Sequence, residues 1–282
     1  MDVKPNLRNI DQAVVSGFGD EWSRFDQSAL SSTDRWRIWS DYFSIFSWET
    51  LPTDAIGVDI GCGTGRWAAL VAPKVGKLLC VDASPDALAV ARRNLHQHEN
   101  VEFQVASVDN LPVPDNSQDF VYSLGVLHHV PDTPAAVRSI VAKLKPGAPI
   151  LLYLYYNFEN RPSWFRALWH LSEFVRRILS HAPHSLTFTA TNLIALGVYW
   201  PLARLAKSAE RCGASVESWP LAYYRDKGLY VMQTDARDRF GTRLEQRFSR
   251  RDISNMLTTA GCVDIVFSER PPFWVAAARR ST

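Results

Sequence analysis

The stretch AIGVDIGCGTGRWAALVA, residues 55–72, decides the fold. Its first part, AIGVDI (55–60), is a short apolar run with the length of a buried strand, and the glycines of GCGTG (61–65) end it. The following TGRWAALVA (64–72) predicts a helix. A strand, a glycine-rich turn and a helix in succession predict half of a βαβ unit with a ligand-binding loop at its centre.

The same alternation of strand and helix continues along the chain. Further strands are expected at KLLCVD (77–82), VEFQVA (101–106), DFVYSL (119–124), PILLYLYY (149–156), VDIVFS (263–268) and FWVAAA (273–278). Helices are expected at SPDALAVARRNLHQ (84–97), TPAAVRSIVAKLKPG (133–147) and SRRDISNMLTTAG (249–261). Short connections between alternating elements predict an α/β fold, a Rossmann-like doubly wound sheet of seven mostly parallel strands.

Four segments are expected from the change of pattern along the chain. Residues 1–50 form a helical segment, residues 51–156 the ligand-binding core, and residues 241–282 the helix and two strands that complete it. Between them, residues 157–240 break the alternation and form a helical insertion rich in Trp and Tyr. The insertion is expected to be a cap over a lipophilic or aromatic molecule; an oligomer interface or simple core is the alternative.

Composition excludes several classes of protein. The 282 residues are 46% apolar and 21% charged, which is ordinary globular usage and excludes a disordered chain, a coiled coil and a collagen-like repeat. A net charge of +2 does not favour nucleic-acid binding. The four cysteines have no C-x-x-C spacing, which fits a reducing cytoplasm, and no acidic or histidine cluster has metal-ligand spacing. The start of the sequence, residues 1–15, does not have the pattern of a signal peptide.

One stretch without charged residues, 178–203, is a candidate for contact with a membrane. Only Leu193 to Trp200 is densely apolar, whereas a spanning helix needs about 20 predominantly apolar residues. A buried helix is the first expectation, and weak contact of residues 186–206 with a membrane surface is the alternative.

The glycine loop and two aspartates suggest the ligand. The glycines run G-x-G-x-G, and Arg66 occupies the third glycine position of a dinucleotide loop. Asp59 lies two residues before the first glycine, where a carboxylate disfavours pyrophosphate but suits an ammonium or sulfonium group. Asp82 ends the second strand, where it can accept the two ribose hydroxyls of a nucleoside. The alternatives are a plain glycine-rich turn and, for Asp82, an acid at a helix N-terminus.

Four motifs together resemble the class I S-adenosylmethionine-dependent methyltransferases, most closely the small-molecule group that includes the quinone-biosynthesis enzymes. They are VDIGCGTGRW (58–67), CVDASPDAL (80–88), VDNLPVPDNSQDFVYSLGVLHHVPD (108–132) and LKPGAPILLYLYY (144–156). The resemblance covers residues 50–156 and, more weakly, 245–280. It implies an antiparallel C-terminal strand and S-adenosyl-L-methionine as cofactor, and it leaves the acceptor and the oligomeric state open.

The resemblance also implies residue roles. Asp59 would bind the methionine ammonium, Asp82 the ribose hydroxyls, and Ala83 would contact adenine. The remaining cofactor positions would be Gly61, Cys62, Gly63, Gly65, Ser107, Val108 and Leu124. Related enzymes carry an acid at the position of Ser107, and here the nearest carboxylate is that of Asp109, two residues later.

The chemistry is expected just past the fourth and fifth strands. His128 and His129 follow the fourth strand, and an imidazole can take a proton from an acceptor hydroxyl near neutral pH. Packing is the alternative for each. The acceptor is expected to contact Tyr155, Tyr156, Asn157 and Trp22. Trp22, together with Phe18, is also expected to close the mouth of the cofactor site, and core packing is the alternative for both.

The sequence therefore predicts a methyltransferase acting on a small, lipophilic or aromatic molecule. Two alternatives stay open: a nicotinamide-dependent oxidoreductase on the same architecture, and a non-catalytic cofactor-binding or membrane-associated protein.

Overall fold

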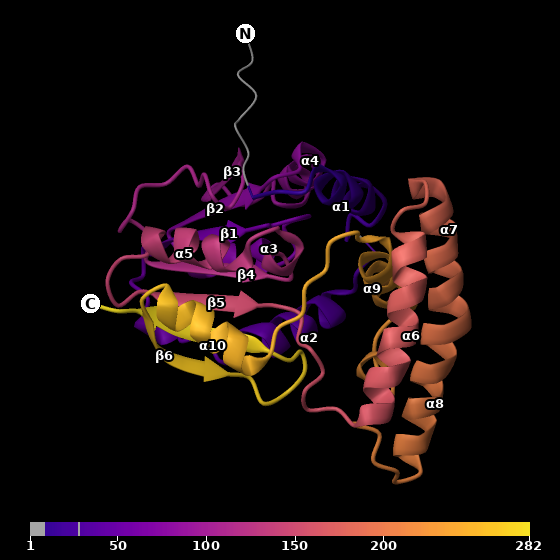
Figure 1. Cartoon of the computed structure of the whole chain (residues 1–282). Coiled ribbons are helices and arrows are strands. Elements are labelled where there is room, and N and C mark those ends of the chain that lie inside the picture. The colour runs from indigo at the N-terminus through magenta and orange to yellow at the C-terminus, as the bar shows by residue number, and fades with distance from the viewer. Residues whose placement is uncertain (1–8, 28) are drawn as a thin grey trace. The chain divides into compact units, whose positions relative to one another are not determined.

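The chain forms two compact units in a computed structural model that describes residues 9–27 and 29–282 (Figure 1). Unit 1 comprises Met1–Gln27, Arg35–Asn157 and Leu244–Thr282. Unit 2 comprises Ser28–Asp34 and Phe158–Arg243. The expected insertion, 157–240, corresponds to most of unit 2. The N-terminal segment, expected as one piece over 1–50, contributes residues to both units.

Unit 1 is built on a seven-stranded sheet with the order β3-β2-β1-β4-β5-β7-β6. The strands are β1 (Ile56–Ile60), β2 (Lys77–Asp82), β3 (Val101–Val105), β4 (Phe120–Leu124), β5 (Pro149–Tyr153), β6 (Cys262–Phe267) and β7 (Val275–Arg280). The first five pair in parallel, and β7 runs antiparallel to both β5 and β6. The predicted Rossmann-like sheet with an antiparallel C-terminal strand is therefore confirmed.

Helices cover both faces of this sheet. They are α1 (Gln12–Arg24), α3 (Ala68–Val71), α4 (Pro85–Asn94), α5 (Thr133–Lys143), α10 (Arg250–Thr259) and most of α2 (Ser32–Phe43). On one face, α5 and α10 share a core with the inward residues of β1, β4 and β5. On the other face, α2 places Phe43 against Tyr122 of β4, with ring centroids 5.3 Å apart. Neighbouring positions of β4 therefore bury their side chains on opposite faces, as a central parallel strand requires.

The helix starts follow from local sequence. Ser84 caps α4 by accepting a hydrogen bond from the backbone N–H of Ala87, and Pro85 occupies the first helical position. Ser249 and Asp252 form a reciprocal capping box at the start of α10. Several expected elements are shorter in the structure. Only Ala68–Val71 of the helix expected at 64–72 is α-helical.

The strand β5 also ends earlier than expected, at Tyr153 rather than at residue 156. Beyond it the backbone leaves the sheet and pairs with the segment before α10. The N–H of Phe248 donates to the carbonyl of Tyr155 at 2.8 Å, and that of Asn157 donates to the carbonyl of Phe248 at 3.1 Å. Tyr155, Tyr156 and Asn157 therefore lie on a connection past the strand.

Unit 2 is helical. It contains α6 (Ser163–Leu179), α7 (His184–Ile194), the π-turn η4 (Ala195–Tyr199), α8 (Trp200–Arg211), the short η5 (Ala222–Tyr224) and α9 (Leu229–Gly241). The helices α6 and α7 both pack on α9, and Figure 1 shows α7 and α8 as one long rod. The core comprises Ala195, Tyr199 and Ala203 on the rod and Met232 and Ala236 on α9.

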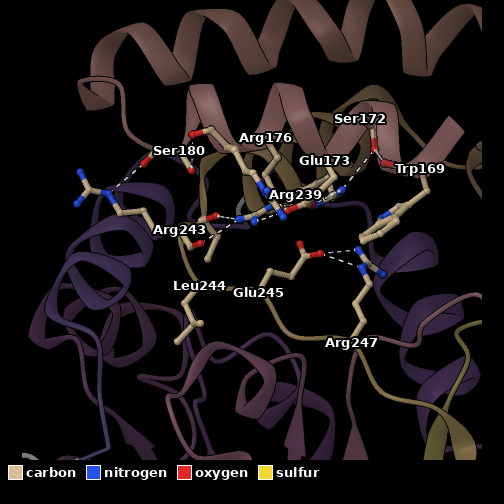
Figure 2. Close-up of polar contacts among 12 residues, drawn as sticks. Trp169, Ser172, Glu173, Arg176, Ser180, Arg239, Arg243, Leu244, Glu245 and Arg247 are labelled. Carbon is tan, nitrogen blue, oxygen red and sulfur yellow. Dashed lines mark hydrogen bonds and ion pairs between the residues drawn. The ribbon is translucent and has the colours of Figure 1, made fainter. Parts of the chain in front are cut away.

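An ion cluster ties α6 to α9 within unit 2 (Figure 2). Glu173 pairs with Arg176 at 2.5 Å and with Arg239 at 3.1 Å, and all three side chains are at least 88% buried. Burial alone would raise the pKa of Glu173, but the two guanidinium groups outweigh it and lower the pKa to about 2. Arg176 also donates to the carbonyls of Thr242 and Arg243. Its buried guanidinium group is therefore both paired with a carboxylate and hydrogen-bonded to the backbone.

Candidate active site

The glycine loop is held against the ends of β1 and β2. The N–H groups of Gly61 and Cys62 both donate to the carbonyl of Val81, at 2.7 and 3.1 Å. Gly61, Gly63 and Gly65 all have positive φ, the region that favours glycine. A Cβ on Gly61 would come within 2.4 Å of the Val126 side chain, so this loop needs glycine for packing as well as for conformation.

Asp82 fixes the loop from the end of β2. Its two carboxylate oxygens accept hydrogen bonds from the N–H of Gly63 at 2.9 Å and of Ser84 at 2.8 Å. A carboxylate offers about four acceptor sites, so lone pairs remain on both oxygens for a diol. Burial raises the pKa of Asp82, and the backbone N–H donors counteract that rise. The residue thus fits the ribose role that the resemblance implies.

Asp59 lies in β1, buried to 99%, beside the loop. The hydroxyl of Tyr122 donates to its carboxylate at 2.9 Å. Desolvation raises the pKa of Asp59 to about 8; the Tyr122 hydrogen bond and Arg66 oppose that rise, and the nearby Asp82 adds to it. A buried acid that holds its proton this strongly is suited to a cationic group, whose charge would stabilise the ionised form.

Ser107 stands where related enzymes carry an acid, and the carboxylate of Asp109, two residues later, lies beside it. Ser107 is buried, and its hydroxyl donates to the carboxylate of Asp109 at 2.5 Å. A carboxylate therefore lies at this edge of the sheet even though Ser107 itself carries none. Val108 is buried beside Ser107 and its carbonyl accepts from the Ser139 hydroxyl. Cys62 is buried, and its thiol pKa is raised well above the usual value by a hydrogen bond with Cys80 and by burial.

The two histidines occupy the turn η3 (Leu127–His129) and have different surroundings. His128 is fully buried, and its ring lies 3.8 Å from that of Tyr155, nearly parallel to it. Burial, His129 and Arg247 lower the pKa of His128 well below the usual range, so it is neutral at physiological pH. Among the described residues, neither of its ring nitrogens has a hydrogen-bond partner.

His129 is oriented by a backbone carbonyl. Its Nδ1 lies 2.7 Å from the carbonyl oxygen of Leu244, and only a protonated nitrogen can donate there. This assignment leaves the lone pair of the neutral ring on Nε2. The ring also contacts Phe18 of α1, with centroids 5.0 Å apart.

The sequence reasoning missed one part of this site, the segment 244–248. The N–H of Gln246 donates to the carbonyl of His128 at 2.9 Å, so the segment runs beside η3. Glu245 and Arg247 form an ion pair at 2.7 Å in which both side chains are largely buried (Figure 2). The Arg247 guanidinium lies 5.1 Å from the Tyr155 ring centroid, so this pair borders the ring that stacks on His128. The one signal in the sequence is the opposite charge of Glu245 and Arg247 two residues apart, and their burial is visible only in the structure.

Trp22 lies beside the glycine loop, and its expected contact with the acceptor stays a prediction. Its indole nitrogen lies 3.2 Å from the position that a Cβ on Gly63 would occupy. Trp22 therefore packs on the glycine loop. Its neighbour Phe18, one helical turn away, stacks on Trp22 and reaches His129. The helix α1 thus links the glycine loop with the histidine turn.

The structure brings most predicted site residues to one edge of the sheet. Asp59, the glycine loop, Asp82 and Ser107 lie at the carboxyl ends of β1 to β3, where open parallel sheets bind ligands. Leu124 ends β4 and is buried. Tyr156 is directed differently from Tyr155. It lies against Phe273 and Trp274, with centroids 5.6 and 6.3 Å away. Within the described residues, no group of three His, Cys, Asp or Glu is placed to hold a metal ion.

Comparison with known proteins agrees with this geometry. Residues 58–152 match the family model described as a methyltransferase domain. A ubiquinone biosynthesis O-methyltransferase from Xanthomonas axonopodis pv. citri is 30% identical over 135 residues, which are 47% of this chain and 55% of the relative. A demethylmenaquinone methyltransferase from Bacillus licheniformis is 26% identical over 149 residues, 51% of this chain and 63% of the relative. The chain thus spans little more than half the length of these curated relatives.

A solved structure shares the fold over nearly the whole chain. A Bacillus halodurans protein, provisionally described as a methyltransferase, superimposes with a TM-score of 0.52 at 14% identity. The match covers 89% of this chain and 100% of that one. This likeness supports the fold, and the family match identifies residues 58–152, the core of unit 1, as a methyltransferase domain of the class I S-adenosylmethionine-dependent type, with S-adenosylmethionine as its cofactor. The expected family and cofactor are confirmed for this core domain.

Proposed function

We propose that this protein transfers a methyl group from S-adenosylmethionine to a hydroxyl on a small, lipophilic, aromatic acceptor. The observation that carries the proposal is the set of rings past β4 and β5. The Tyr155 ring stacks on His128 and lies 5.8 Å from that of Tyr153, while Phe18 lies against His129. Flat apolar walls with a few placed polar groups are typical of sites for aromatic ligands.

The named relatives support the same class of acceptor. One acts in ubiquinone biosynthesis and the other on demethylmenaquinone. A lipophilic ring that carries a hydroxyl would match both the stacked rings and the neutral, buried His128 of this chain.

The residues present fit the cofactor. Asp82 retains lone pairs for the ribose, the glycine loop permits close approach of its backbone, and Asp59 is ready to give up its proton beside a cation. When bound, S-adenosylmethionine supplies an electrophilic methyl group on a sulfonium. The remaining requirements are alignment of the acceptor oxygen, exclusion of water and removal of one proton.

We assign proton removal to His129. The Leu244 carbonyl orients the ring so that Nε2 carries the lone pair, and Nε2 would take the hydroxyl proton as the new C–O bond forms. His128, held neutral against Tyr155, would form part of the acceptor wall. The guanidinium of Arg247, paired with Glu245, lies over the Tyr155 ring and holds it in place.

A methyl-transfer screen tests the proposal. Purified protein is incubated with S-adenosylmethionine and a panel of catechols, quinols, simple phenols and aromatic amines, and products are identified by a mass gain of one methylene group. We expect transfer to a hydroxyl of an apolar aromatic compound, and a large loss of that transfer in His129→Ala with cofactor affinity retained. Methylation confined to amines or to polar, non-aromatic compounds would overturn the assignment of the acceptor.

A further inference from the structure

Unit 2 exposes an unusual amount of apolar surface. Of the seventeen large apolar side chains that are exposed in the described residues, thirteen lie between Trp164 and Leu205. Soluble proteins rarely expose contiguous apolar patches of this kind unless the patch binds something.

On α6 these side chains form one stripe. Its members, which we call the α6 stripe, are Trp164, Leu168, Leu171, Phe174, Val175 and Ile178. The spacing of three and four residues places them on one side of the helix. Leu171 and Phe174 are 65% and 64% exposed, so neither serves the core of the unit.

Basic side chains border the α6 stripe. Arg166, His170 and Arg177 are exposed on the strip of α6 between the apolar stripe and the side that packs on α9. Between residues 161 and 211 there are seven Lys or Arg and two Asp or Glu, a net charge of +5, whereas the whole chain carries +2. No acidic residue occurs between residues 174 and 209. An apolar face edged with arginines is complementary to an anionic lipid surface.

The rod of α7 and α8 adds further exposed apolar side chains, including Leu193, Leu196, Trp200 and Leu205. The stretch His184–Arg211 is long and apolar enough to cross a membrane by length and composition. Its other side, however, packs against the rest of unit 2. Asn192 accepts a hydrogen bond from Gln233 at 2.8 Å, and Arg204 donates to the carbonyls of Arg225 and Lys227.

A spanning rod would have to break these polar contacts and place Arg204 in hydrocarbon, which is costly. A rod lying in the plane of the membrane keeps them. Trp164 and Trp200, which are 51% and 45% exposed, have the amphipathic rings that settle at the level of lipid headgroups.

We propose that unit 2 docks on the surface of an anionic phospholipid bilayer, with the α6 stripe and the outer side of the α7–α8 rod inserted at the level of the headgroups. A second copy of the chain is a poorer occupant, because two such faces would bring their basic side chains together. The docking is independent of which acceptor the site of unit 1 methylates.

Vesicle flotation of the full chain tests the docking. We expect the protein to float with vesicles of phosphatidylcholine plus phosphatidylglycerol and much less with phosphatidylcholine alone. Binding should weaken at ~1 M NaCl, where the screening length is about 3 Å. The double variant Leu171→Glu, Phe174→Glu should bind at least about tenfold more weakly. Its far-ultraviolet circular dichroism spectrum should match that of the wild type, which shows that the helices of unit 2 have formed, and it should still bind S-adenosylhomocysteine through unit 1.

The matched control carries the same two new charges elsewhere. Val263→Glu with Val266→Glu alters side chains of β6 that are 46% and 49% exposed, and it should float like the wild type. A second measurement needs no charged variant: brominated lipids should quench tryptophan fluorescence, and Trp164→Phe should reduce that quenching.

Three outcomes would overturn the proposal. They are a wild-type chain that stays in solution with both kinds of vesicle, equal weakening by the control variant, and a dimer that the Leu171→Glu, Phe174→Glu variant dissociates without any vesicle binding. The last of these would assign the face to a second copy. The vesicle measurements do not depend on methyl transfer, so a negative acceptor screen would not change their interpretation.

Discussion

Cofactor binding should be coupled to the release of a proton from Asp59. The pKa of this buried carboxyl is raised to about 8, so at pH 7 about nine in ten molecules hold it protonated. The resemblance places the methionine ammonium beside Asp59, and a cation there requires the ionised form. Binding at pH 7 should therefore release about 0.9 proton.

The same coupling sets the pH dependence of affinity. About half of the Asp59 carboxyls are ionised at pH 8 and about 1% at pH 6. The dissociation constant of the cofactor should therefore be about fiftyfold higher at pH 6 than at pH 8. Because the folded pKa is raised, the neutral carboxyl also favours folding at low pH, and this contribution is lost as pH rises through about 8. The cofactor-free protein should accordingly lose stability between pH 6 and pH 8.5.

Isothermal titration of S-adenosylhomocysteine in two buffers of different ionisation enthalpy measures the proton count directly. Asp59→Asn is the control, since the amino group of the ligand titrates equally with both proteins and its effect cancels. Tyr122→Phe removes the hydrogen bond that lowers the pKa, and should move the midpoint to higher pH. An affinity that is flat from pH 6 to 8.5 in the wild type, with no proton released, would refute the reasoning.

Three further predictions concern single positions. Gly65→Ala should cost more stability than Gly63→Ala, although both residues have positive φ. A Cβ at Gly65 would lie 2.6 Å from the fully buried side chain of Leu95, whereas one at Gly63 would lie 3.2 Å from the partly exposed indole of Trp22. Alanine at positive φ itself costs about 1–2 kcal/mol, so thermal unfolding should show that loss at Gly63 and more at Gly65, and equal losses would count against the loop geometry. His129→Ala should lower turnover by about 10²–10⁴ with an unchanged dissociation constant for the cofactor, and unaltered single-turnover rates would remove it as the base. Glu173→Gln should destabilise the protein by about 2 kcal/mol at pH 7, because two buried guanidinium groups lose their charge partner. The pKa of Glu173 is lowered, so its contribution is present above about 4.5 and is lost as pH falls towards 2; urea unfolding at pH 7 and pH 3 should show a smaller difference between variant and wild type at pH 3.

The local features of the fold could be predicted from the sequence. Runs of apolar residues gave the strands, and Ser84 and Ser249 marked the helix starts, because capping is decided within a few residues. The glycine loop and the two aspartates could be placed for the same reason. They lie at the ends of consecutive strands, which a parallel sheet brings to one edge.

Contacts between distant segments could not be predicted in this way. Tyr122 is 63 residues from the Asp59 that it bonds, and Leu244 is 115 residues from the His129 that it orients. Periodicity shows which side of an element is buried, but it does not say which distant group lies opposite. For that reason the roles of Glu245 and Arg247 were missed.

The displaced acid beside Ser107 shows the same limit at short range. Aligning the motif position by position assigns no carboxylate there, but a turn of the backbone returns Asp109 to the hydroxyl of Ser107. A sequence motif gives the order of residues along the chain, whereas ligand binding depends on where their side chains lie in space.

Calorimetric titration of S-adenosylhomocysteine against the wild type and Asp82→Ala tests the central claim most directly, with NADH as the competing ligand. Asp82 should accept both ribose hydroxyls, and hydrogen bonds to a charged group are worth roughly 1.5–3 kcal/mol each. The account predicts saturable binding of S-adenosylhomocysteine by the wild type, no binding of NADH, and at least about a tenfold loss of affinity in Asp82→Ala. Binding of NADH in place of S-adenosylhomocysteine, or equal affinity of wild type and Asp82→Ala for S-adenosylhomocysteine, would contradict it.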